Sequence, residues 1–194
     1  MSIPVLTTER LVLRGWQAAD RVPFAAINGD PAVMEWFPAP LTRKESDAMA
    51  DRIEAHFARH GFGLWAVELR ATGAFIGYVG LAVPGFETAF MPCVEIGWRL
   101  AAEQWGKGLA TEGAREVVRH GFEALGLEEV VSFTVPGNVR SRRVMEKLGM
   151  RRDAAEDFDH PLLAEGHTLR RHVLYRLQRG GQQQSDLLLR IERR

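Results

Sequence analysis

The sequence predicts a single α/β domain with a mostly antiparallel central sheet of about seven strands and flanking helices. Segments that alternate apolar and polar residues, as strands do, are separated by segments of helical periodicity. Between residues 93 and 135 the order is strand, glycine-bearing turn, helix, strand. Such a step makes its two strands parallel through a right-handed crossover. No internal repeat or second domain is apparent.

Composition limits the classes of function. A chain of 194 residues suits one well-buried domain. Lysine plus arginine balance aspartate plus glutamate at 25 each, so no overall charge favours nucleic acid or an anionic membrane. The single cysteine, Cys93, excludes an internal disulfide. Since neither a signal peptide nor a membrane-spanning apolar run is evident, we expect a cytoplasmic protein. We also expect it to be a monomer or a homodimer.

The N-terminal part predicts one strand and three helices. Residues 9–16 alternate like a strand, and residues 18–28 are typical of a short helix. Asp30-Pro31 has the residue types of an N-cap and a first helical position, which predicts a helix opening there. Residues 42–60 begin with capping-box spacing and predict a longer helix that ends at Gly61.

The rest of the chain predicts the remaining strands and a further helix. Residues 64–70 and 75–83 predict a hairpin. Asn138 is the expected N-cap of a helix over residues 139–148. The other strands are expected at residues 93–100, 129–135, about 150–158 and about 168–177. Residues 179–194 have the polar composition of a flexible tail.

The turn after residues 93–100 predicts an anion site. In that strand Val94, Ile96, Trp98 and Leu100 form an apolar row. The turn contains Gly106 and Gly108, which let bare backbone approach a ligand. The unpaired N–H groups of the following helix's first turn then favour an anion, most often a phosphate.

In these motifs the chain resembles the GNAT superfamily of acetyl-CoA-dependent N-acetyltransferases. It is most similar to the Rim-type (RimJ/RimL-like) branch, which contains the N-terminal acetyltransferases of ribosomal proteins. The resemblance rests on residues 8–14 (TERLVLR), 105–112 (WGKGLATE), 138–141 (NVRS) and 146–150 (EKLGM). It covers about residues 7–178 and implies one GNAT domain over residues 1–178 in which the fourth and fifth strands are parallel and splayed.

The resemblance implies acetyl-CoA as co-substrate and no metal. The amides of the turn would hold the pyrophosphate, the edge of the fourth strand would pair with the pantetheine, and Asn138 and Ser141 would lie beside its distal end. Trp105 departs from the glutamine or arginine usual at its position. The expected contacts are Trp98, Arg99, Leu100, Trp105, Gly106, Lys107, Gly108, Leu109, Ala110, Thr111, Asn138 and Ser141.

Other interpretations of these residues remain open. The turn could be a tight strand-to-helix connection, whereas a dinucleotide site is disfavoured because Thr111 replaces its third glycine. His56 and His60 could suit a metal, but no third ligand is evident and a solvated helix face is favoured. Cys93 could be a nucleophile, although a buried strand cysteine is the simpler interpretation.

The chemistry that the resemblance implies is attack of a neutral primary amine on the acetyl thioester. Glu95 is the candidate base, because a carboxylate desolvated in the cleft would have a raised pKa. Ser141 is the candidate to protonate the leaving thiolate, since Met145 occupies the position where the family often has tyrosine. The alternatives are a solvated strand glutamate and a helix-capping serine.

The sequence leaves the acceptor open between a protein N-terminal α-amine and a small-molecule or antibiotic amine. Phe24, Trp36 and Phe37 are the candidate acceptor contacts, with core packing as the alternative for each. The acidic segment 153–159 would favour a cationic amine or is simply solvated. A non-catalytic CoA-binding or interaction module is the rival function. Nucleic-acid and membrane partners are not expected, because no basic stripe with aromatics occurs.

Overall fold

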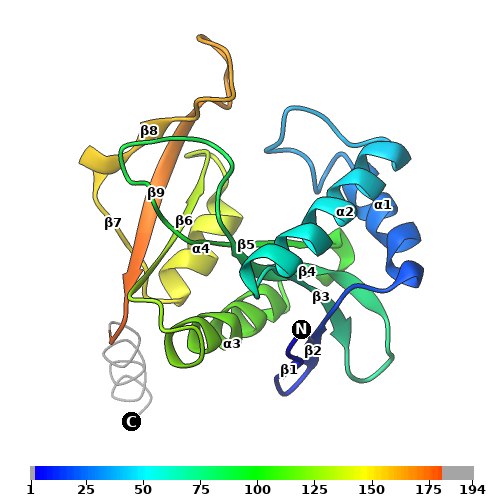
Figure 1. Ribbon diagram of the computed structural model, residues 1–194. Helices are drawn as coiled ribbons and strands as arrows, with labels where there is room; N and C mark the ends of the chain where they lie inside the picture. Colours follow the sequence, from blue (N-terminus) through cyan, green and yellow to red (C-terminus); the bar gives the residue numbers. More distant parts are fainter. Residues whose placement is uncertain (1–2, 181–194) are drawn as a thin grey trace. The chain divides into compact units, whose positions relative to one another are not determined.

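The computed structural model describes residues 3–180 (Figure 1). The chain forms two compact units. The first comprises the residues up to Ala82 together with Ile96–Val117, and the second comprises Val83–Glu95 together with the residues from Val118 onward. The division falls within one strand and within one helix.

The first unit contains a sheet in the order β1-β2-β3-β4-β5. Antiparallel ladders join the first four of these strands. The expected hairpin is present as β3 and β4, with Gly73 at a φ of 69° in its turn. The bounds are β1 Leu6–Thr7, β2 Leu11–Arg14, β3 Leu64–Leu69, β4 Phe75–Ala82 and β5 Glu95–Leu100, of which all but Glu95 belong to this unit.

Helices cover both faces of this sheet. Helix α3 (Leu109–Glu123) packs through Gly113, where an added Cβ would lie 3.4 Å from side-chain atoms of Leu11 and Val79. On the other face the ring of Phe24, from α1 (Arg21–Gly29), lies 6.1 Å from that of Tyr78. Successive strand residues point to opposite faces, as Tyr78 and Val79 do here. The turns η1 (Ala18–Asp20) and η2 (Ala102–Gln104) complete the unit.

Helix α2 (Arg43–His60) confirms its sequence signals. The Thr42 hydroxyl accepts from the N–H of Glu45, and the Glu45 carboxylate accepts from the N–H of Thr42, which is a complete capping box. Gly61 ends the helix at a φ of 75°. The cap and the terminator therefore set both ends of the element.

The helix expected from Asp30-Pro31 is not formed. The segment makes hydrogen-bonded turns instead, with the Met34 N–H donating to the Asp30 carbonyl at 3.0 Å. The Asp30 carboxylate accepts from the N–H of Ala32 at 2.8 Å, a local turn contact. Pro38 and Pro40 follow at once, so a helix opening here would have too few residues to be stable.

The second unit has an antiparallel β6–β9 pair as its centre. Strand β9 also pairs with β7 and β8, which are short pieces of the segment expected to be extended at residues 150–158. Helix α4 (Val139–Lys147) follows β6. The bounds are β6 Glu129–Thr134, β7 Arg151–Arg152, η3 Ala154–Glu156, β8 Phe158–Asp159 and β9 Arg171–Gln178.

The start of β5 supplies a parallel strand to the second unit. Glu95 lies opposite Val131 of β6, and the Val131 N–H donates to the Val94 carbonyl at 2.9 Å. This pair is parallel, whereas β1–β2, β2–β3, β3–β4, β6–β9, β7–β9 and β8–β9 are antiparallel. It confirms the predicted parallel pairing of the strands that precede and follow α3.

Two sequence expectations concern the C-terminal tail and membrane-spanning helices. Most of the polar tail, residues 181–194, lies outside the described residues. Among the helices between residues 3 and 180, none combines the length and the apolar character needed to cross a bilayer.

Candidate functional site

The turn before α3 contains two glycines in the left-handed backbone region. Gly106 and Gly108 have φ values of 74° and 78°, which side-chain-bearing residues rarely adopt. The Glu112 N–H donates to the Gly108 carbonyl at 3.0 Å and is the first helical bond of α3. The N–H groups of residues 109–111 precede that bond, in the first turn of the helix, where N–H groups have no partner within the helix.

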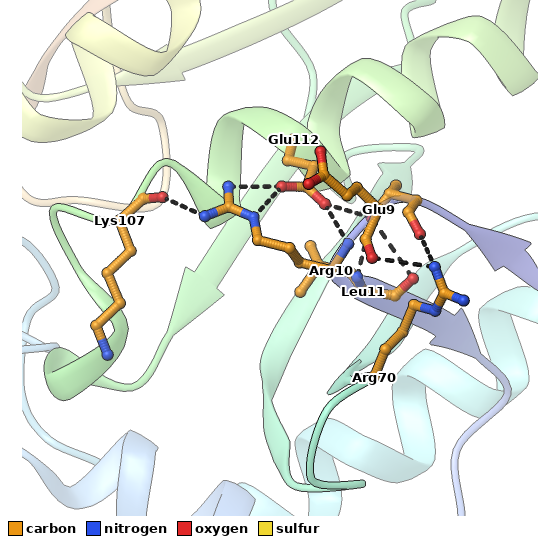
Figure 2. A network of polar contacts seen from close by, with 7 residues as sticks. Glu9, Arg10, Leu11, Arg70, Lys107 and Glu112 are labelled. Atoms are coloured by element: carbon orange, nitrogen blue, oxygen red, sulfur yellow. Dashed lines mark hydrogen bonds and ion pairs between the residues drawn. The ribbon is translucent and has the colours of Figure 1, made fainter.

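A polar network from the N-terminal segment holds this turn in place (Figure 2). The Arg10 guanidinium donates through Nε to Glu112 Oε2 at 2.7 Å and through Nη1 to the Lys107 carbonyl at 3.0 Å. The Thr8 hydroxyl donates to Glu112 Oε1 at 2.6 Å. Arg70 fixes the same N-terminal segment by donating to the carbonyls of Thr8 and Glu9. Arg10 thus connects the turn to the first turn of α3.

Glu112 stays ionised within this network. Burial disfavours its charge, but the hydrogen bonds from the Thr8 hydroxyl and from the Arg10 backbone and side chain outweigh burial, so the pKa of Glu112 lies below its usual value. A carboxylate in the first turn of a helix would by itself repel an anionic ligand. The Arg10 charge at 2.6 Å neutralises it.

The side chains of Trp105 and Lys107 make contacts within the protein. Trp105 Nε1 donates to the Leu100 carbonyl at 2.9 Å, and the ring packs against the cluster of Ile27, Val33 and Ala101. This anchors the turn to the end of β5. The Lys107 ammonium donates to Gln104 Oε1 at 3.1 Å.

Strand β5 is more buried than its alternation predicts. Leu100 is buried and Trp98 half-buried, as expected for the apolar row. Arg99 belongs to the polar row yet is only 7% exposed. Its guanidinium donates to Asn28 of α1 at 2.6 Å.

Glu95 and Cys93 lie at the start of β5 in the second unit. Glu95 is half-buried, and desolvation by the surrounding protein raises its pKa to about 8. Burial, reinforced by the nearby Glu95 charge, raises the pKa of Cys93 to about 11. Glu95 therefore has the pKa of a useful base, whereas Cys93 remains a thiol at neutral pH.

Asn138 caps α4 as the sequence indicates. Its Oδ1 accepts from the Ser141 N–H at 3.1 Å, and its Nδ2 donates to the Thr134 hydroxyl at 3.0 Å. Ser141 is half-buried in the first turn of the helix, and Met145 is buried one turn later. A phenol is present elsewhere in this unit, where Tyr175 donates to Glu146 at 3.2 Å.

The three candidate acceptor contacts differ in exposure. Phe24 is fully buried, 4.7 Å from the ring of Trp16, and forms part of the core. Trp36 is half-buried, while Phe37 is 40% exposed. Phe37 alone of the three offers a largely accessible ring.

The two helical histidines contact each other. The rings of His56 and His60 are 4.4 Å apart, and His56 Nδ1 lies 2.9 Å from the Phe62 carbonyl oxygen. Burial lowers the pKa of His56. Residues 3–180 contain no group of three or more metal-ligating side chains.

Sequence reasoning missed the roles of Thr8, Arg10 and Glu112 and the burial of Arg99. Thr8, Arg10 and Glu112 lie in motifs that carry the family resemblance. For Arg99, alternation predicts only which face of the strand the side chain occupies, not how deeply it is buried. The contact between Arg10 and Glu112 joins residues 102 positions apart. The available signal was that the two motifs occur together, one carrying the positively charged Arg10 and the other the negatively charged Glu112.

Comparison with known proteins identifies the family. Residues 10–151 match the family described as "Acetyltransferase (GNAT) domain". The chain is 37% identical over 160 residues to FsC-acetyl coenzyme A-N(2)-transacetylase of Aspergillus fumigatus, covering 76% of this chain and 65% of that protein.

Solved structures share the fold. An acetyltransferase from Agrobacterium tumefaciens is 28% identical, with a TM-score of 0.74 over 92% of this chain and 96% of its own. RimJ of Mycobacterium smegmatis, solved in complex with CoA-disulfide, is 20% identical, with a TM-score of 0.71 over 92% of this chain and 90% of its own. The mixed, mostly antiparallel sheet, with its one parallel pair within residues 3–180, is the GNAT fold. The chain belongs to the GNAT family of acetyl-CoA-dependent N-acetyltransferases.

Proposed function

We propose that the protein transfers the acetyl group of acetyl-CoA directly to a primary α-amine, with Glu95 as the base. The observation that carries this proposal is the position of Glu95 at the start of the parallel β5–β6 pair, half-buried and desolvated. The printed name of the Aspergillus relative, an N(2)-transacetylase, supports a nitrogen acceptor.

The reaction needs little from the base. A peptide α-amine has a pKa near 8 and is about a tenth neutral at pH 7, whereas a lysine amine is neutral less than about a thousandth of the time. The neutral nitrogen attacks the thioester carbonyl, the C–N bond forms and the C–S bond breaks. The surplus proton on nitrogen passes to the Glu95 carboxylate and from there to solvent. The departing CoA sulfur takes up a proton, which we assign to solvent directly or to Ser141, whose hydroxyl is then reprotonated by solvent.

Direct attack is supported against a covalent enzyme intermediate. Cys93, the single cysteine, has its pKa raised to about 11, so very little thiolate is present near neutrality. The thiolate is the nucleophilic form of cysteine. Cys93 therefore makes a poor acceptor for the acetyl group.

The cofactor turn completes the proposal. We assign the CoA pyrophosphate to the amides of residues 106–111, where the glycine conformations and the helix start agree. Trp98, Arg99 and Leu100 would offer the backbone edge for the pantetheine, and Asn138 would lie near its distal end. Among the acceptor candidates, Phe37 is retained because its side chain is 40% exposed, and Trp36 is retained because it is only half-buried.

The test replaces Glu95 by glutamine. We expect Glu95→Gln to lower kcat by about a hundredfold to ten-thousandfold, because general-base catalysis contributes about that much. The affinity for acetyl-CoA, measured by calorimetry, should be unchanged. Glu123→Gln, at an exposed ion pair with Arg119, is the matched control and should keep full activity. An unchanged kcat in Glu95→Gln would remove Glu95 from the reaction.

A further inference from the structure

We infer that Arg99 is the binding site for a carboxylate carried by the amine acceptor. This inference names the substrate class for the proposed acetyl transfer and rests on that function. Arg99 carries a buried positive charge in the first unit, and its side-chain partners are uncharged.

Every contact of the Arg99 side chain is uncharged. Nη1 donates to Asn28 Oδ1 at 2.6 Å and contacts the Met49 sulfur at 3.6 Å. The guanidinium carbon lies 4.2 Å above the Phe37 ring and 5.6 Å from the Tyr78 ring. Among residues 3–180, these are its partners, and none of them is an anion. A buried charge without a counter-charge is costly to the folded protein, so a ligand that supplies one should bind well.

The unused edge of the guanidinium has the shape of a carboxylate receptor. Both hydrogen bonds of Arg99 use Nη1, and the buried Nε has no partner in the part of the chain that is described. The N–H bonds of Nε and Nη2 run parallel along one edge. That edge matches the two oxygens of a carboxylate in a bidentate pair.

The surroundings hold this edge in a fixed orientation. Asn28 accepts from Arg99 and is itself held, because its Nδ2 donates to the Ser46 hydroxyl at 2.9 Å. Both Asn28 and Ser46 are fully buried. Phe37, which is 40% exposed, covers the flat face of the guanidinium. The donor pair is therefore pre-oriented, and a ligand would reach the buried Nε only if a covering group such as the 40%-exposed Phe37 ring moved aside.

The anion is assigned to the acceptor rather than to CoA. Arg99 contacts α1, α2 and Tyr78, on the sheet face opposite α3. The turn that would hold the pyrophosphate leads into α3. A charge bound at Arg99 thus comes from a different molecule, and an amine acceptor with its own carboxylate has the required chemistry.

The test compares matched pairs of acceptors. A series of short peptides of increasing length, each with a free N-terminal α-amine, is assayed for CoA release, with the C-terminal carboxylate of each compared with its carboxamide. We expect the wild type to prefer the carboxylate of the best-fitting length by about tenfold to a hundredfold in kcat/KM, the range for hydrogen bonds to charged groups. Arg99→Met should bring that ratio to about one. Arg99→Lys, which keeps the charge without the fork, should retain part of it.

Two further measurements decide between explanations. Arg43→Met removes an exposed arginine that pairs with Asp47 and should keep the full preference. If Arg99→Met instead weakens acetyl-CoA binding and leaves the acceptor ratio intact, the anion belongs to CoA and the inference is wrong. A wild type that turns over acids and amides equally also overturns it, with no variant needed. If no amine of either kind releases CoA, the proposed function itself fails.

Discussion

At the scale of single residues, charges in this protein act through their neighbours. Glu112 stays ionised because Thr8 and Arg10 donate to it, and Glu95 takes up a proton more readily because protein replaces water around it. Arg99 is charged and buried against uncharged groups. Function is therefore assigned from environment, not from residue type.

Arg10 should position the cofactor turn without stabilising the fold much. Its side chain is 46% exposed, and such ion pairs contribute about 0–1 kcal/mol. Arg10→Met should nevertheless raise the Kd for acetyl-CoA by about tenfold, because the Lys107 carbonyl and Glu112 lose their common donor and Glu112 then repels the phosphates. Calorimetry gives the Kd, and a thermal scan gives the stability.

The matched control is Arg119→Met, which breaks another exposed pair on α3. It should leave the Kd unchanged. A drop in thermal stability of Arg10→Met with an unaltered Kd would show that the network is structural only.

At the scale of elements, the sequence predicts helix ends and turns correctly where the residues that determine them are close together in the chain. The capping box of α2, the Asn138 cap of α4 and the glycine turn are each set by residues within about one helical turn of one another. Asp30-Pro31 carries the same kind of signal but gives turns, because Pro38 and Pro40 leave no room for a helix. A start signal thus predicts a helix only when enough helical sequence follows.

A substitution at Gly106 tests whether acetyl-CoA binding depends on the backbone conformation of the turn. Gly106→Ala places a methyl group in open space but at a φ of 74°, so the cost is conformational, about 1–2 kcal/mol. We expect the variant to lose acetyl-CoA binding by more than about tenfold, because relief of the strain rotates the amides that face the phosphates.

Gly126→Ala is the matched control, because it introduces the same backbone strain at a position outside the cofactor turn. Gly126 has a φ of 72° and equally open space around its missing Cβ. Both variants should lose similar stability in a thermal scan, but only Gly106→Ala should weaken acetyl-CoA binding. Equal effects of the two on the Kd would contradict the assignment of the turn to the phosphates.

At the scale of the whole molecule, the fold class could be predicted because alternation, caps and motif order all depend on neighbouring residues. The nine strands within residues 3–180 exceed the expected seven because β1 was missed and residues 150–158 break into β7 and β8. The contact of Arg10 with Glu112 and the enclosure of Arg99 by Asn28 and Phe37 join distant segments. No local pattern encodes such contacts, so they required the structure.

The central claim, that Glu95 is the base, is tested most directly by the pH dependence of its contribution. The measured quantity is the ratio of kcat/KM between wild type and Glu95→Gln with one acceptor, because the ionisation of the amine cancels in that ratio. With a pKa of about 8, Glu95 is protonated and unable to accept a proton at lower pH. The ratio should rise about tenfold per pH unit below pH 8 and level off above it. A ratio that stays constant from pH 6 to pH 9 would contradict the account.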